Sequence, residues 1–164
     1  MVTVATRTHL APAPADGTAG TPAHARVRVV LAEDHATMRR SLRLLLDSEP
    51  DIEVVAESGE LATATRQVFK LAPDVLVLDV RMPDGSSFDI VEHLRAQVPR
   101  TRIVVITMYD DQAFARHAHG AGALGFVLKD TADAELPEAV RCAAHGRTYT
   151  SPRITPHVVP LRKL

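Results

Sequence analysis

The 164-residue chain has one cysteine, no tryptophan and only 4% aromatic residues. The lone Cys142 excludes an intramolecular disulfide and any CxxC metal site, and it is typical of a reducing compartment. No apolar run approaches the roughly 20 residues of a membrane span. A net charge of −1 argues against a chain that mainly coats nucleic acid. We therefore expect a cytoplasmic protein with one hydrophobic core, since a single domain of this length needs no disulfide or metal ion to fold.

Three segments of different charge divide the chain. Residues 1–26 are rich in alanine, proline, threonine and glycine and have no periodic apolar face, which predicts a disordered N-terminal extension. A secretory signal needs a basic start and an apolar stretch that this segment lacks, whereas its scarcity of acids leaves a transit peptide as an alternative. Residues 147–164 carry a net charge of +4 and three prolines, which predicts a basic linker or tail. Residues 27–146 form the predicted folded body, with a net charge of −6.

The body alternates apolar, β-branched runs with amphipathic segments. The predicted strands cover residues 27–32, 52–56, 74–78, 102–106 and 123–128, and the predicted helices cover residues 37–48, 59–71, 86–97, 111–119 and 131–145. Five strands that alternate with five helices predict an α/β fold, a doubly wound parallel sheet covered on both faces. The flavodoxin-like strand order 2-1-3-4-5 is one of the two common ways to wind such a chain.

Polar residues follow four of these strands directly. Glu33 and Asp34 come after the first strand, Asp79 after the third, Thr107 after the fourth and Lys129 after the fifth. A parallel sheet would bring all of them to one edge, where three carboxylates repel one another. A hard divalent cation with oxygen ligands relieves that repulsion, and Mg²⁺ fits because it uses few carboxylates together with phosphate oxygens. An aspartate in such a place can itself be a nucleophile and form an aspartyl phosphate.

Four motifs make the sequence resemble a known family. They are LAEDH at 31–35, LDVRMPDG at 78–85, VVITMYDD at 104–111 and GALGFVLKD at 122–130. With them, the body resembles the receiver (CheY-like) domain of two-component response regulators, and most closely the NarL/FixJ type. The resemblance covers residues 27–146. It implies a flavodoxin-like fold and a role in phosphorelay signal transduction.

The resemblance implies that Asp79 accepts a phosphoryl group from a histidine kinase. Glu33 and Asp34 would hold Mg²⁺ together with Asp79 and the backbone carbonyl of Arg81. Transfer to an aspartate is an in-line displacement in which positioning and charge neutralisation supply most of the catalysis. Such a domain is not an enzyme beyond its own Mg²⁺-dependent phosphorylation and dephosphorylation.

The same resemblance implies a switch. Thr107 would hydrogen-bond a phosphoryl oxygen and Lys129 would pair with the phosphoryl group. Phe126 stands where the family has an aromatic switch residue, often tyrosine, and would turn inward into the space that Thr107 vacates. Arg81 and Tyr109 occupy positions that tune the dephosphorylation rate. Phosphorylation would thereby change a surface for a partner or for homodimerisation.

The NarL/FixJ type also implies regulation of transcription. Its members usually continue into a helix-turn-helix domain that binds DNA, and residues 146–159 resemble the linker that precedes it. Three prolines prevent residues 147–164 from forming that domain. We therefore expect DNA contact only through a C-terminal domain missing from this sequence, so that the chain is a piece of a transcription regulator or a stand-alone receiver.

Two alternatives from other classes remain open. A receiver-like adaptor could signal by protein contact without phosphorylation, although such chains typically lose the acid pair, the aspartate or the lysine. A Mg²⁺-dependent phosphatase of the haloacid-dehalogenase type could turn over an aspartyl phosphate. Those enzymes carry a second aspartate two residues after the nucleophile, where this chain has Arg81.

Other residues within these motifs are expected to have local roles. His35 follows the acid pair and is expected to be a polar loop residue rather than a metal ligand. Asp110 or Asp111 is expected to cap the helix over residues 111–119.

Overall fold

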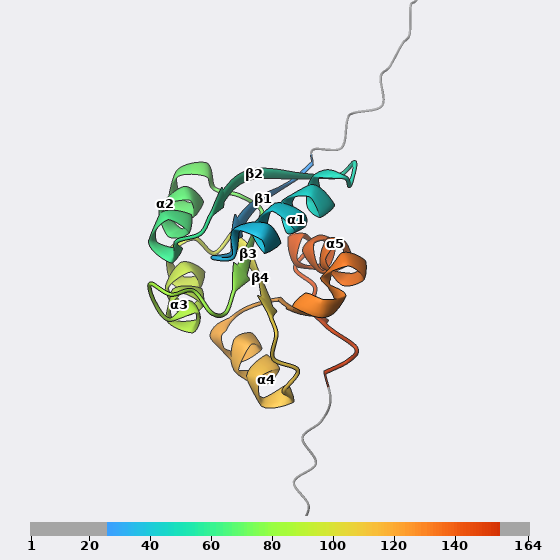
Figure 1. Ribbon diagram of the computed structural model, residues 1–164. Coiled ribbons are helices and arrows are strands. Elements are labelled where there is room, and N and C mark those ends of the chain that lie inside the picture. Colours follow the sequence, from blue (N-terminus) through green and yellow to red (C-terminus); the bar gives the residue numbers. More distant parts are fainter. Residues whose placement is uncertain (1–25, 155–164) are drawn as a thin grey trace, which may run out of the picture.

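The computed structural model describes residues 26–154, which form a parallel sheet between two layers of helices (Figure 1). The strands are β1 Val27–Ala32, β2 Ile52–Ser58, β3 Val75–Asp79, β4 Arg102–Thr107, β5 Gly125–Leu128 and β6 Tyr149–Thr150. The helices are α1 Ala36–Asp47, α2 Leu61–Leu71, α3 Ser87–Gln97, α4 Gln112–Ala121 and α5 Ala132–Ala144, with a 3-10 turn, η1, at Lys129–Thr131. The strand order is β2-β1-β3-β4-β5-β6.

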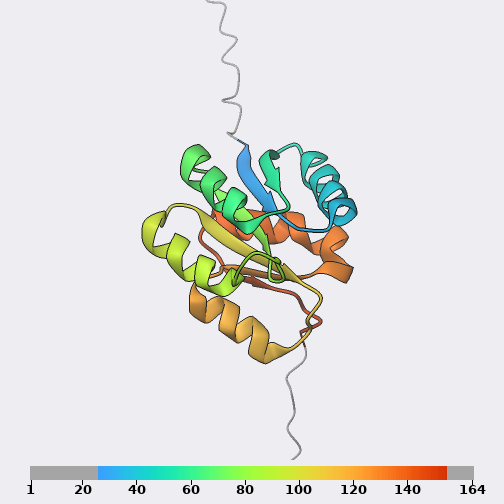
Figure 2. The ribbon, with the colours of Figure 1, turned by 60° about the vertical axis from the view of Figure 1, so that its left-hand side comes forward.

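Alternation along the strands divides the core into two layers. Val30 and Ala32 of β1 pack in the cluster with α2, α3 and α4, whereas Val29 and Leu31 pack in the other with α1 and α5. Figure 2 shows the same division, with α2, α3 and α4 on one side of the sheet and α1 and α5 on the other. Every residue of β3 is buried, as expected for a central parallel strand covered on both faces.

The predicted α/β fold, its five helices and the order 2-1-3-4-5 are confirmed, but the sheet has a sixth strand that was not predicted. β6 pairs in parallel with β5, through a Tyr149 amide that donates to the Leu124 carbonyl oxygen at 2.8 Å. The prediction missed it because two residues are too few to show a strand period, and the neighbouring prolines indicated a tail. The described chain therefore stays packed on the body beyond residue 146, through Ile154.

The predicted disordered extension over residues 1–26 lies outside the described residues except for Arg26, as do residues 155–164 of the predicted tail. Within the described part, no helix is both long and apolar enough to cross a membrane.

Aspartates of two loops cap the amino-terminal ends of α4 and α2. Asp111 caps α4 as expected, since its carboxylate accepts a hydrogen bond from the Ala113 amide at 2.7 Å. At α2, the residue in the cap position makes no side-chain cap. Instead Asp84, in the loop after β3, accepts hydrogen bonds from the amides of Leu61 and Ala62 at 2.9 and 3.1 Å. These hydrogen bonds lower the pKa of Asp84, and the one from the Leu61 amide has the largest effect. They also hold the β3–α3 loop against α2.

Candidate functional site

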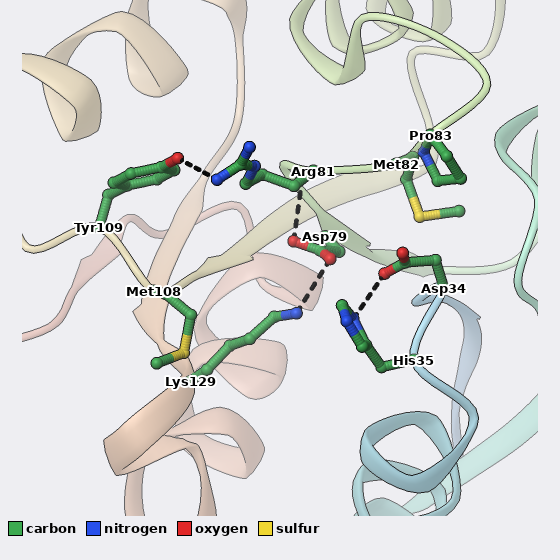
Figure 3. A pocket seen from close by; sticks show the side chains of 9 residues that line it. All are labelled: Asp34, His35, Asp79, Arg81, Met82, Pro83, Met108, Tyr109 and Lys129. Carbon is green, nitrogen blue, oxygen red and sulfur yellow. Dashed lines mark hydrogen bonds and ion pairs between the residues drawn. The ribbon is translucent and has the colours of Figure 1, made fainter.

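A pocket of about 600 Å³ opens at the carboxyl edge of the sheet, where β1 and β3 lie side by side (Figure 3). The chain winds outward in opposite directions from this pair of strands, and in open α/β sheets such a switch point forms a crevice for ligands. Asp34, Asp79 and Lys129 line the pocket. Buried Glu33 lies behind them, 2.6 Å from the Lys129 ammonium. The predicted acid pair, aspartate and lysine are therefore brought together.

Asp79 ends β3 and is only 2% exposed. Its Oδ1 accepts a hydrogen bond from the Arg81 amide at 3.0 Å, and its Oδ2 accepts one from Lys129 Nζ at 2.9 Å. The Ser87 hydroxyl donates to the Asp79 backbone carbonyl at 2.9 Å and so ties the start of α3 to the end of β3. The carboxylate is thus held in one orientation at the base of the pocket.

Lys129 lies between two carboxylates. Its Nζ is 2.6 Å from Glu33 Oε2 and 2.9 Å from Asp79 Oδ2, and its side chain is 7% exposed. Burial by itself would lower the pKa of Lys129, but its close contacts and charge interactions with Glu33 and Asp79 together raise it. The ammonium is therefore charged at neutral pH and neutralises one of the acids.

Acids outnumber bases at this edge. Ligand atoms of Glu33, Asp34, His35 and Asp79 all lie within 4.8 Å of one another. Among the described residues, none makes a well-formed hydrogen bond to Glu33 Oε2 or Asp34 Oδ1, although Lys129 Nζ is 2.6 Å from the first and His35 Nδ1 is 2.9 Å from the second. Buried carboxylate oxygens in excess of donors fit a hard divalent cation.

His35 occupies the cap position of α1, and its side chain is 74% exposed. Its backbone amide donates to Glu33 Oε1 at 3.1 Å, and its ring Nδ1 lies 2.9 Å from Asp34 Oδ1. The expected loop residue therefore contacts both members of the acid pair.

Thr107 and Phe126 lie deeper. Thr107 ends β4, is 1% exposed, and its hydroxyl accepts a hydrogen bond from the Tyr109 amide at 3.1 Å. Phe126 is fully buried in the core layer of α2, α3 and α4. The proposed turn of Phe126 into the space beside Thr107 stays a prediction.

One contact across the pocket could not be found in the sequence. The Arg81 guanidinium donates to the Tyr109 hydroxyl at 2.6 Å and lies 5.7 Å from the centre of its ring (Figure 3). The Tyr109 ring in turn packs on Phe114 of α4, with 5.0 Å between ring centres. The motifs marked both Arg81 and Tyr109 but not their pairing, because the two residues follow different strands.

Residues 29–141 match the response regulator receiver domain family. The chain belongs to this family. It is 36% identical to the oxygen regulatory protein NreC of Staphylococcus epidermidis over 134 residues, which are 81% of this chain and 62% of that protein. The chain thus spans less than two thirds of the length of this relative.

Solved receivers have the same fold. A LuxR-family two-component response regulator from Aurantimonas sp. is 34% identical, with a TM-score of 0.75 over 79% of this chain and 93% of that one. The signal receiver domain of the response regulator NarL from Mycobacterium tuberculosis is 33% identical, with a TM-score of 0.71 over 75% and 99% of the two chains. This receiver is therefore of the NarL/LuxR type, and the predicted family is confirmed.

Proposed function

We propose that Asp79 of this receiver accepts a phosphoryl group from the histidine of a two-component kinase. The supporting observation is a buried carboxylate at the base of an open pocket, held by one amide and one ammonium. In the transfer, an Asp79 oxygen forms a bond to phosphorus while the bond from phosphorus to the kinase nitrogen breaks. The acyl phosphate that results is on Asp79, so each receiver carries one phosphoryl group at a time.

Mg²⁺ fits the acidic cluster, and Glu33, Asp34, Asp79 and the Arg81 backbone carbonyl would hold it. When bound, the ion supplies positive charge that offsets the phosphoryl oxygens and the carboxylates. The excess of carboxylates over bases in the described pocket supports this assignment.

Lys129 and Thr107 are the proposed groups that hold the phosphoryl. Lys129 already contacts the reacting carboxylate, so its ammonium can pair with a phosphoryl oxygen after a small movement away from Glu33. The Thr107 hydroxyl can donate to such an oxygen while it still accepts from the Tyr109 amide. Since the Tyr109 ring packs on Phe114 of α4, a movement of Thr107 would be passed to that helix. Phe126 is the neighbouring residue proposed to repack.

The test is incubation of the chain with acetyl phosphate, with and without Mg²⁺, followed by intact mass. One phosphoryl group should be gained only with Mg²⁺, and Asp79→Asn should gain none. Asp110→Asn, which changes an exposed acid of the β4–α4 loop, is the matched control and should react like the wild type. No gain by the wild type would favour the phosphorylation-independent adaptor, and a gain by Asp79→Asn would place the acceptor elsewhere.

The phosphatase alternative finds no support in the pocket. Such an enzyme would need an aspartate two residues after Asp79 as its general acid and base. This chain has Arg81 there, whose guanidinium is hydrogen-bonded to the Tyr109 hydroxyl. A Mg²⁺-dependent phosphatase would release inorganic phosphate from acetyl phosphate over many turnovers, which the same incubation would show.

A further inference from the structure

The segment Tyr149–Ile154, which we call the C-terminal strap, lies along β5 and is held to it by its backbone. The Tyr149 amide donates to the Leu124 carbonyl and the Ser151 amide to the Phe126 carbonyl, at 2.8 and 2.9 Å. The strap also reaches His119 of α4. The Thr150 hydroxyl lies 2.9 Å from Nε2 of the His119 ring. Nδ1 of the same ring lies 2.8 Å from the Ala123 carbonyl oxygen. The strap is therefore bound to two elements of the body.

Ser151 is the buried anchor of the strap, with 2% of its surface exposed. Its hydroxyl accepts a hydrogen bond from the Leu128 amide at 3.0 Å and donates to a carboxylate oxygen of Glu135 in α5. Leu128 directly precedes Lys129 in the chain. The hydroxyl thus holds the backbone at the point from which the Lys129 side chain departs.

The strap also contacts the residue that follows Lys129. The Arg153 guanidinium lies 2.5 Å from a carboxylate oxygen of Asp130. Both members of this pair are about half exposed, at 59% and 47%, so the pair adds little by itself. The two chain neighbours of Lys129 are nevertheless both tied to the strap, and the buried tie through Ser151 is the stronger.

We propose that the C-terminal strap positions Lys129, with Ser151 as the positioning residue, and that docking of the strap is coupled to phosphoryl occupancy at Asp79. This inference rests on the proposed function of Asp79. Lys129 Nζ reaches Asp79 and Glu33 at 2.9 and 2.6 Å, so a shift of its backbone would misplace the ammonium. Misplacement by about 1 Å is enough to lower a reaction rate strongly.

Coupling between two sites is reciprocal. If the docked strap raises the affinity of the pocket for a phosphoryl group, an occupied pocket must hold the strap more tightly by the same factor. The direction follows from the contacts, because the docked strap is the form in which Leu128, and with it Lys129, is held in place. Phosphorylation therefore fastens the strap to β5 rather than releasing it.

The experiment uses the 164-residue chain with Mg²⁺ and beryllofluoride, which stands in for the phosphoryl group. Its dissociation constant is measured for the wild type, for Ser151→Ala and for Thr101→Val. The Thr101→Val control also loses a buried hydroxyl hydrogen bond, the one to the Pro73 carbonyl at 2.8 Å. Thr101 precedes β4 and so lies at the amino-terminal ends of the strands, away from the pocket. Ser151→Ala should weaken binding about fivefold or more, and Thr101→Val should leave it unchanged.

Hydrogen exchange of the wild type gives a second reading that needs no variant. Saturation with beryllofluoride should slow exchange of the Tyr149 and Ser151 amides by about the factor lost in Ser151→Ala. Exchange that stays the same or becomes faster would overturn the coupling, even if Ser151→Ala does not fold. Equal affinities of Ser151→Ala and the wild type would overturn the positioning role alone.

Failure of the proposed function has a different signature. A wild-type chain that binds no beryllofluoride and gains no phosphoryl group from acetyl phosphate would overturn the proposal for Asp79, and the coupling with it. A wild type that does both, with an unresponsive strap, would leave the role of Asp79 intact and overturn only the inference about the strap.

Discussion

Two clusters of this receiver have the same chemical ingredients, two carboxylates and one base, and differ in burial. We call them the site triad (Glu33, Asp79 and Lys129) and the surface triad (Glu49, Asp51 and Arg141). Side chains of the site triad are 0 to 7% exposed, whereas those of the surface triad are 28 to 47% exposed. Contacts within both are close, so distance does not distinguish them.

The surface triad is a structural tie. Arg141 of α5 donates to both carboxylate oxygens of Asp51, each at 2.8 Å, and pairs with Glu49. These hydrogen bonds lower the pKa of Asp51 and raise that of Arg141. Water screens such a pair, so it holds α5 to the turn before β2 at a small gain in free energy.

The charges of the site triad are buried, so water does not screen them. Removal of ions from water is costly, and a third acid, Asp34, leaves the cluster with an excess of negative charge. An arrangement like this is poor for stability and suited to holding a cation and an anionic group. Burial, rather than composition, therefore separates the candidate binding site from the surface tie.

The largest expected difference comes from removal of the base. Lys129→Met should lower the free energy of unfolding by about 3 kcal/mol, because it leaves buried carboxylates without a partner. Arg141→Met should lower it by less than about 1 kcal/mol, since water replaces the lost contacts. Urea unfolding at pH 7 without Mg²⁺ measures both. Equal losses would show that burial does not distinguish the two triads.

Addition of Mg²⁺ should stabilise the site triad only. At a hundred times its dissociation constant, the ion should raise the free energy of unfolding by about 2.7 kcal/mol. Arg141→Met should keep the whole gain, and Asp34→Asn should lose most of it, because a proposed ligand is gone. Sodium chloride at equal ionic strength is the control, and a similar gain from it would argue against a specific site.

A smaller effect of opposite sign is expected from Asp34→Asn without Mg²⁺. Removal of one excess charge should raise the free energy of unfolding by about 1 kcal/mol. Asp110→Asn, an exposed acid nearby, should change it by less than about 0.5 kcal/mol. A destabilised Asp34→Asn variant in urea unfolding would show that the acids are not in excess.

The two triads should respond at opposite ends of the pH scale, and the response of the surface triad is the smallest effect expected. The pKa of Asp51 lies below its ordinary value of 3.8, so the surface triad is stabilising above that value and loses its contribution as pH falls through the lowered pKa. The pKa of Lys129 is raised above 10.5, so the site triad contributes below that value and loses its contribution as pH rises through the raised pKa. Unfolding of the wild type and Arg141→Met should converge in acid. Convergence in alkali instead would contradict this assignment.

Much of the molecule could be predicted from local sequence patterns. Five apolar runs, separated by amphipathic segments, predict the strands, the helices and a parallel sheet because each pattern is contained in about ten residues. Residues that end such strands must meet at one edge, so the gathering of Asp34, Asp79 and Lys129 followed from topology. Their roles in phosphotransfer stay predictions.

The strap and the loop contacts could not be predicted in this way. β6 has only two residues, and Ser151 finds its partner Leu128 across 23 residues of sequence. Asp84 follows β3, yet it caps α2, which begins 23 residues earlier in the chain. Such hydrogen bonds depend on where packing places two distant segments, and a local pattern carries no record of it.

The family, the order of the elements and the edge at which the acids and the lysine collect follow from periodicity and from strand ends, which short stretches of sequence carry. Packing sets which acid–base cluster is buried, the contact of Arg81 with Tyr109, and the hydrogen bond of Ser151 to the backbone beside Lys129. Burial and hydrogen-bond partners are properties of the packed chain, because they depend on side chains that are far apart in the sequence.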